Sequence, residues 1–199
     1  MFERWESFHQ EGRKVGALWR RFDDGVLSSR IAFPLGDGQT YRAESVITFQ
    51  ADGASWASAS YRQEPGDVAS ALARTAAGLG EDSLPSFGEF MLVLDLIASG
   101  GEAVEFQRLD DADPAARPAR AVLTWQGTEK VGLADGPREC RRLDLLVDGE
   151  RAGSHWADAG GVVKSEWAGA VSYPEATADD ALAGLPPEIA DFVRNGFGG

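Results

Sequence analysis

The feature that most constrains this chain is a series of short alternating segments between residues 122 and 173, separated by Gly and Asp-Gly turns. Asp148-Gly149 is a typical two-residue hairpin turn, Ala159-Gly160-Gly161 marks a second turn and Ala168-Gly169 a third. Two strands joined by so short a turn run antiparallel. Three hairpins within about fifty residues predict a meander, the building unit of a curved antiparallel sheet.

The segment before Asp148 indicates how such a strand packs. Its two-residue period places Leu143, Leu145 and Val147 on one face of the sheet. Arg142 and Asp144 then belong to the opposite face, which we expect to be open to solvent. On that view a substitution of Asp144 by Ser changes stability little.

The first sixty residues repeat this hairpin style. Asp23-Asp24-Gly25 and Ala51-Asp52-Gly53 are the expected turns between strands. The expected strands cover residues 2–9, 14–22, 26–33, 41–50 and 54–62.

The middle and the end of the chain have a different character. Residues 68–78 combine high helix propensity with an N-cap candidate, Asp67, and predict a short helix. Residues 87–97 form the most apolar stretch, whose periodicity is compatible with a buried helix or a buried strand. We favour the helix because the apolar residues at 90, 93, 94 and 97 fall on one helical face. Residues 112–120 predict an exposed loop, and residues 178–197 a C-terminal helical tail that packs on the sheet.

Composition sets the outer limits. With 199 residues, of which 43% are hydrophobic, residues 1–199 are expected to form a single β-rich domain. The formal net charge of −13 argues against nucleic acid and anionic lipid surfaces as partners, and no apolar run is long enough to span a membrane. The single Cys140 and the absence of a recognisable leader favour the cytoplasm, with the periplasm as the alternative if a leader has been removed.

Several short motifs occur in an order that is similar to a known family. They are Gly12–Gly16, Gly100–Phe106, Glu129–Val131, Arg138–Leu143, Ser154–Asp158 and Gly161–Glu166. Their order resembles the bacterial family called domain of unknown function 3108. The resemblance implies a strongly curved antiparallel sheet akin to the lipoprotein carriers LolA and LppX, and it implies no established activity.

Together these patterns predict a mainly β protein with one curved antiparallel sheet. We expect a β-roll or an open, lipocalin-like barrel, with a central helical segment and a C-terminal helix. The sequence contains no nucleophile elbow, no phosphate-binding Gly-rich loop and no dinucleotide fingerprint. Two His and one Cys far apart in sequence predict no metal site, and no cofactor is expected.

Acids and bases that could transfer a proton are few. His155 lies on an expected strand, with Asp158 three positions later and Glu166 across the following hairpin, and Tyr41 and Tyr61 are further candidates. Positions 155 and 158 point to opposite faces of a regular strand, so Asp158 fits the start of a turn better than a partner for His155. A surface histidine is the simpler interpretation of His155.

Five tryptophans fall on five different expected strands: Trp19, Trp56, Trp125, Trp156 and Trp167. If several of them share the concave face, they line an apolar cavity that holds a hydrophobic molecule. Plain core packing is the alternative.

Three functions are therefore open. The first is the binding of an apolar small molecule or lipid in the concave face of the roll. The second is a β-barrel cyclase, isomerase or hydratase that moves a proton on an apolar, natural-product-like substrate. The third is a protein-interaction module that uses exposed sheet edges.

Overall fold

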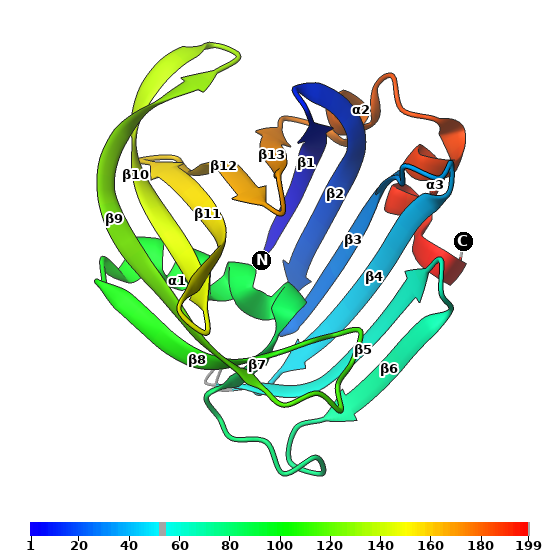
Figure 1. The fold of residues 1–199 in the computed structure, drawn as a ribbon, viewed down its shortest axis with the longest axis vertical. Helices are drawn as coiled ribbons and strands as arrows, with labels where there is room; N and C mark the ends of the chain where they lie inside the picture. The colour runs from blue at the N-terminus through cyan, green and yellow to red at the C-terminus, as the bar shows by residue number, and fades with distance from the viewer. Residues whose placement is uncertain (52–54, 199) are drawn as a thin grey trace.

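The computed structural model describes residues 1–51 and 55–198. These residues fold as one sheet of thirteen strands that curls around a helix (Figure 1). The strands follow the order β6-β5-β4-β3-β2-β1-β13-β12-β11-β10-β9-β8-β7. The expectation of a mainly β fold with a central and a C-terminal helix is confirmed.

The first half of the sheet consists of β1 (Phe2–Gln10), β2 (Arg13–Asp23), β3 (Val26–Pro34), β4 (Thr40–Phe49), β5 (Trp56–Glu64) and β6 (Val68–Ala73). The second half consists of β7 (Ser83–Pro85), β8 (Ala103–Leu109), β9 (Ala119–Leu133), β10 (Gly136–Val147), β11 (Glu150–Asp158), β12 (Gly161–Trp167) and β13 (Ala170–Glu175). The helices are η1 (Ser86–Gly88), α1 (Glu89–Ser99), α2 (Ala178–Leu182), α3 (Pro187–Asn195) and η2 (Gly196–Gly198).

The two halves meet where the first and last strands pair. The antiparallel pairing of β1 with β13 makes the seam of the sheet. At the two outer edges of the sheet, side chains of β5 and β6 bind backbone carbonyls of β7 and of the segment after β8. The Trp56 indole donates to the Ser83 carbonyl at 2.7 Å, and the Ser70 hydroxyl donates to the Asp111 carbonyl at 2.8 Å. The sheet is therefore curled far enough for its edges to approach, as in a barrel.

Helix α1 fills much of the inside of this curled sheet (Figure 1). Phe90, Val93 and Leu96 on the helix are buried against inward-facing residues of both halves, such as Ile47 and Leu143. The helix ends where a glycine in the left-handed region follows its last residue. The apolar stretch at 87–97 is thus a buried helix, as its pattern predicts.

The opposite face of β1–β3 is covered by the C-terminal helices. Ile189, Phe192 and Val193 of α3 pack against Trp19, while the neighbouring Leu18 faces inward. The tail at 178–197 is two helices separated by a Gly184 turn and a proline pair, with Pro187 as the first residue of α3. The sheet is therefore packed on both faces along β2 and β3.

The structure corrects the expected helix at 68–78. Residues Val68–Ala73 form strand β6, which pairs antiparallel with β5, and a series of turns follows. Pairing to the open edge of β5 satisfies the backbone groups that a helix would satisfy internally. In this Ala-rich segment the tertiary contact therefore overrides helix propensity.

Two further expectations are wrong. The strands are not antiparallel throughout, because the short β7 runs parallel to β8. Asp144 is not on an open face: it is buried, and it accepts bonds from Arg142 at 2.7 and 2.8 Å and from Ser154. The long Arg142 side chain and the Ser154 hydroxyl lie against Asp144, so this polar residue is enclosed.

The other strand and loop boundaries in the structure agree closely with those predicted from the sequence. The connection between β8 and β9 is a loop that ends at Pro118, close to the expected loop at 112–120. The expected turn at Ala51-Asp52-Gly53, and Ala54 at the start of the next strand, lie outside the described residues except for Ala51. Strand β5 is described from Trp56 onward.

Gly16 lies where β2 approaches β3 closely, and a substitution at this position tests that contact. A Cβ atom at this position would lie 2.1 Å from the Ala32 carbonyl oxygen and 2.8 Å from the Phe33 Cβ. We expect Gly16→Ala to lower the free energy of unfolding by about 1–3 kcal/mol, because backbone must move to make room. Urea unfolding measures this change. Gly132→Ala, where a Cβ meets nothing within 4 Å, is the control and should change stability by less than about 0.5 kcal/mol.

Candidate functional site

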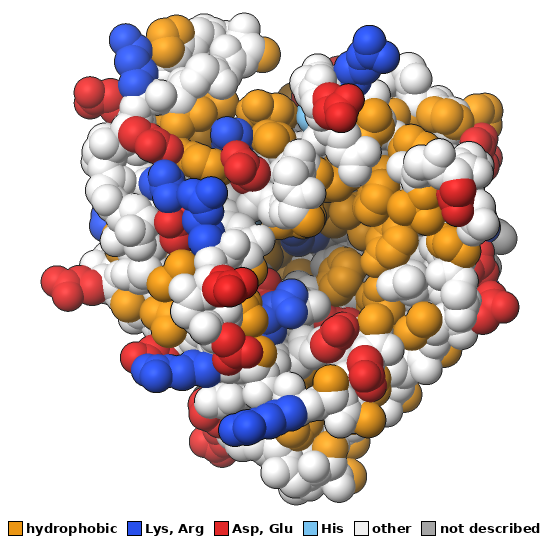
Figure 2. All heavy atoms as spheres, in the orientation of Figure 1, with side chains coloured by type: hydrophobic (Ala, Val, Ile, Leu, Met, Phe, Trp, Pro, Cys, Tyr) orange, Lys and Arg blue, Asp and Glu red, His pale blue; other side chains and the backbone are white. Residues whose placement is uncertain are grey.

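The candidate site is a cavity of about 400 Å³ beside the first turn of α1, called here the interior cavity. Its apolar wall is formed by Leu18, Ile31 and Phe33 from β2 and β3, and by Leu145 and Trp167 from the other half of the sheet. Figure 2 shows a hollow between the two halves, with hydrophobic side chains along its wall and basic side chains inside it.

A buried ion cluster lies next to this cavity. The Glu6 carboxylate is fully buried and accepts bonds from the Arg4 guanidinium at 2.8 Å, from Arg20 and from the Ser172 hydroxyl. Burial by itself would raise the pKa of Glu6, but Arg20 and Arg4 outweigh it and lower the pKa to about 2. The guanidinium of Arg20 also lies over the Phe90 ring at 4.4 Å and lines the cavity.

A second ion pair lies on the helix side of the cavity. Glu89, the first residue of α1, accepts a bond from the Arg108 Nε of β8, and both side chains line the cavity. Burial raises the pKa of Glu89 to about 7, because Arg108 and Arg20 only partly offset the loss of solvent. Glu89 is therefore the carboxylic acid of the site that exchanges a proton near neutral pH.

His155 faces the interior cavity and is not on the surface. Its Nδ1 lies 2.8 Å from the Ser165 hydroxyl, and its ring meets the Phe90 ring edge-on at 6.4 Å. Burial, with the charge of Arg20, lowers the pKa of His155 to about 4. The imidazole is thus neutral at physiological pH and is a weak base there.

Asp158 and Glu166 do not join His155. Asp158 ends β11, where its carboxylate accepts from the Gly160 N–H at 2.7 Å and from Arg138 at 2.9 Å on the outer face. It starts the turn, as its position before Ala159-Gly160 suggests. Glu166 lies at the rim of the cavity and pairs with Lys164 at 3.5 Å.

Tyr41 and Tyr61 lie together across β4 and β5. Their hydroxyls are 3.0 Å apart, and both donate to the Gln63 amide oxygen, Tyr61 at 2.7 Å and Tyr41 at 3.2 Å. Burial raises the pKa of both phenols, so both are protonated at neutral pH. Tyr41 lines the interior cavity and places a hydroxyl on its wall.

The structure does not bring the five tryptophans onto one wall. Trp167 lines the interior cavity, and Trp56 and Trp125 belong to the core around α1. Trp19 lies under the C-terminal helices, and Trp156 lies on the outer face with Val131 and Cys140. Among the five, Trp167 is thus the one placed to contact a molecule in the interior cavity.

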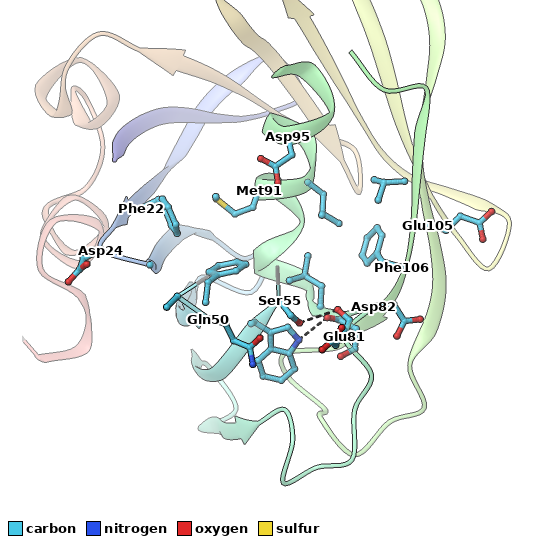
Figure 3. A pocket seen from close by; sticks show the side chains of 18 residues that line it. Phe22, Asp24, Gln50, Ser55, Glu81, Asp82, Met91, Asp95, Glu105 and Phe106 are labelled. Atoms are coloured by element: carbon cyan, nitrogen blue, oxygen red, sulfur yellow. Dashed lines mark hydrogen bonds between the residues drawn. The ribbon is translucent and has the colours of Figure 1, made fainter. Parts of the chain in front are cut away.

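A second cavity of about 810 Å³ lies farther along α1 and is called here the end cavity (Figure 3). Aromatic side chains, among them Phe22 and Phe106, line it together with Met91. Asp24 and Glu105 point away from the space in Figure 3, and the Glu81 and Ser83 carbonyls already accept bonds from the Ser55 hydroxyl and the Trp56 indole. The charged side chains of Arg20, Glu89 and Arg108 line the interior cavity and not the end cavity, and they mark the interior cavity as the candidate site.

The described residues, 1–51 and 55–198, contain no group of three or more His, Cys, Asp or Glu side chains that could hold a metal ion. Within the same residues, each helix is too short or too polar to cross a membrane.

Sequence reasoning missed the charged residues of the site, although a signal for them exists. Arg4 and Glu6 occupy inward positions of β1 between Phe2 and Phe8. Arg20 likewise occupies an inward position of β2, between Leu18 and Phe22. Charged residues at the inward positions of an alternating strand mark a polar interior. Glu89 carries the same signal as an acid within the most apolar stretch of the chain.

Comparison with known proteins finds a similarity of fold and none of sequence. No protein-family model matches the chain, and no curated protein matches it in sequence. A solved structure similar to this one is a β-barrel-like protein of a domain of unknown function, 1849, from Brucella abortus. It is 7% identical, with a TM-score of 0.49 and coverage of 87% of this chain and 94% of the other. The resemblance to the domain of unknown function 3108 stays a prediction.

The Glu6 cluster predicts a defined pH dependence of stability. The pKa of Glu6 is lowered from 4.5 to about 2, so its stabilising effect is present above about pH 4.5 and is lost as the pH falls through about 2. We expect Glu6→Gln to lower the free energy of unfolding at neutral pH by about 3–5 kcal/mol, since two guanidiniums lose their partner. Urea unfolding at several pH values measures both effects.

The difference between the Glu6→Gln variant and the wild type should shrink as the pH falls below about 4. Glu105→Gln is the control, because Glu105 forms an exposed pair with Arg120; it should change stability little at any pH. A difference for Glu6→Gln that is constant from neutral pH to about pH 2 would contradict the assigned role of the carboxylate.

Proposed function

We propose that this protein binds an apolar small molecule in the interior cavity. The observation that carries the proposal is a cavity of about 400 Å³ with an apolar wall and a few polar groups that converge at one end. Ligand sites in proteins typically have this volume and this combination of surfaces. The polar groups are supplied by Arg20, Glu89, Arg108 and His155.

The affinity is expected to come from apolar area removed from water. At about 25 cal/mol per Å², burying about 300 Å² contributes about 7.5 kcal/mol before the costs of association are subtracted. Leu18, Ile31 and Phe33 are held by strands and need little reordering when a ligand enters. A ligand can therefore enter a preformed cavity, whereas a filled core would have to open before it could bind one.

Trp167 provides the direct test. It lines the interior cavity, so the protein should bind the neutral probe N-phenyl-1-naphthylamine saturably, and 1-bromodecane, whose bromine quenches an indole only on contact, should displace the probe and quench part of the protein's Trp emission. In Trp167→Phe the probe should still bind, as followed by its own fluorescence, while most of the Trp quenching is lost. Trp156→Phe, on the outer face, is the matched control and should keep the quenching.

Two results would count against the proposal. Absence of saturable binding of the probe by the wild-type protein would remove apolar ligand binding and leave the interaction module. Binding with equal quenching in Trp167→Phe and in the wild type would place the ligand outside the interior cavity.

A second candidate function is proton transfer on an apolar substrate, and Glu89 is the observation that favours it. Its carboxyl lines the cavity and has a pKa of about 7, the range in which a general acid or base is most effective. His155 is the weaker candidate because its pKa is lowered to about 4. Glu89 therefore replaces His155 as the residue expected to move the proton.

Exchange of α-protons on a simple apolar ketone tests this second candidate. The ketone 2-decalone, incubated with the protein in heavy water, should incorporate deuterium faster than in buffer alone. Glu89→Gln should reduce the protein-dependent rate about a hundredfold or more, while binding of the neutral probe is retained. Proton NMR measures the exchange, and a wild-type rate equal to the buffer rate would exclude general-base catalysis on such ketones.

A further inference from the structure

The guanidiniums of the interior cavity have hydrogen-bond donors to spare. Within residues 1–51 and 55–198, Arg108 donates through Nε to Glu89, and its two terminal nitrogens make no hydrogen bond. Arg20 donates through one terminal nitrogen to Glu6 and leaves the other unbound. Both side chains line the cavity, so the spare donors are accessible from it.

The balance of charge beside the cavity is positive. Arg4, Arg20 and Arg108 are cations, and Glu6 is the carboxylate that the surrounding cations keep ionised. Burial instead raises the pKa of Glu89 and of Asp111, the other acid on the helix side. When Glu89 binds a proton, the three guanidiniums face at most two carboxylates, those of Glu6 and Asp111, so the site holds more positive than negative charge, and this charge is partly removed from water.

A guanidinium with free terminal nitrogens matches the two oxygens of a carboxylate. On the basis of the proposed function, we infer that the ligand of the interior cavity is an apolar carboxylic acid, whose carboxylate binds Arg108 and Arg20. Its apolar part then lies along Leu18, Ile31 and Phe33. A neutral head group would accept fewer and weaker bonds from these donors than a carboxylate does, and a cationic one would be repelled.

Glu89 couples this binding to pH. The charged and titratable groups that face it are Arg108 on β8, Arg20 on β2 and Asp111 after β8, and His155 on β11 and Tyr41 on β4 line the same cavity. An ionised Glu89 competes with the ligand carboxylate for Arg108, whereas a protonated Glu89 does not. Binding of the acid should therefore weaken as the pH rises above about 7.

Displacement of N-phenyl-1-naphthylamine by ten-carbon amphiphiles tests the inference. We expect decanoate to displace the probe at least tenfold better than decan-1-ol, and decyltrimethylammonium to be the poorest of the three. Arg108→Gln should remove the preference for decanoate and keep binding of the alcohol. Arg120→Gln, an exposed arginine on the neighbouring strand β9, is the matched control and should keep the preference.

Two kinds of failure are distinguishable. If the probe does not bind to the wild-type protein, the proposed function itself fails. If the probe binds but decanol matches decanoate, or decyltrimethylammonium exceeds both, the carboxylate inference is overturned and the proposed function stands.

A second variant keeps the test decisive if Arg108→Gln does not fold. The affinity of the wild-type protein for decanoate should fall between about pH 6 and pH 8.5, a range in which the fatty acid itself stays ionised. Glu89→Gln should abolish this fall. A pH-independent affinity in the wild type, or the same fall in Glu89→Gln, would overturn the inference.

Discussion

The Glu6 carboxylate is the interaction on which the rest of the structure depends. It lies on β1, at the seam of the sheet, and is bound by Arg20 of β2 and Ser172 of β13. Arg4, its third partner, also donates to the Val162 carbonyl of β12 at 2.9 Å. Because an unpaired buried ion costs several kcal/mol, these groups stabilise the structure only when they stay together. One side chain on β1 thereby links β2 of the first half of the sheet to β13 of the second half.

The same cluster positions helix α1 and leaves room beside it. The Arg4 and Arg20 guanidiniums lie over the Phe90 ring, at 5.3 and 4.4 Å from its centre. The helix fills the middle of the curled sheet from Phe90 onward, while Glu89 stands one residue earlier, against Arg108. Cavity and core thus lie side by side along one helix, and the charged side chains at its start line the cavity, because burying them away from water and polar partners would cost free energy.

This arrangement unites two functional hypotheses that the sequence leaves separate. A cavity with apolar walls can hold a hydrophobic molecule, and an acid with a pKa of about 7 inside it can transfer a proton to that molecule. In the proposed function, spare donors on Arg20 and Arg108 would add a preference for the charge of the ligand. Binding, orientation and proton transfer would therefore share one set of side chains in the interior cavity.

The sequence by itself determined the hairpins, the buried helix at 87–97 and the C-terminal helices, because turn residues and hydrophobic period act locally. Only the tertiary structure decided that Val68–Ala73 is a strand, since the open edge of β5 is created by residues elsewhere in the chain. It also decided that His155 faces inward and that Glu6 meets Ser172. Contacts between residues more than a hundred positions apart depend on how far the sheet curls, and no local pattern specifies that curvature.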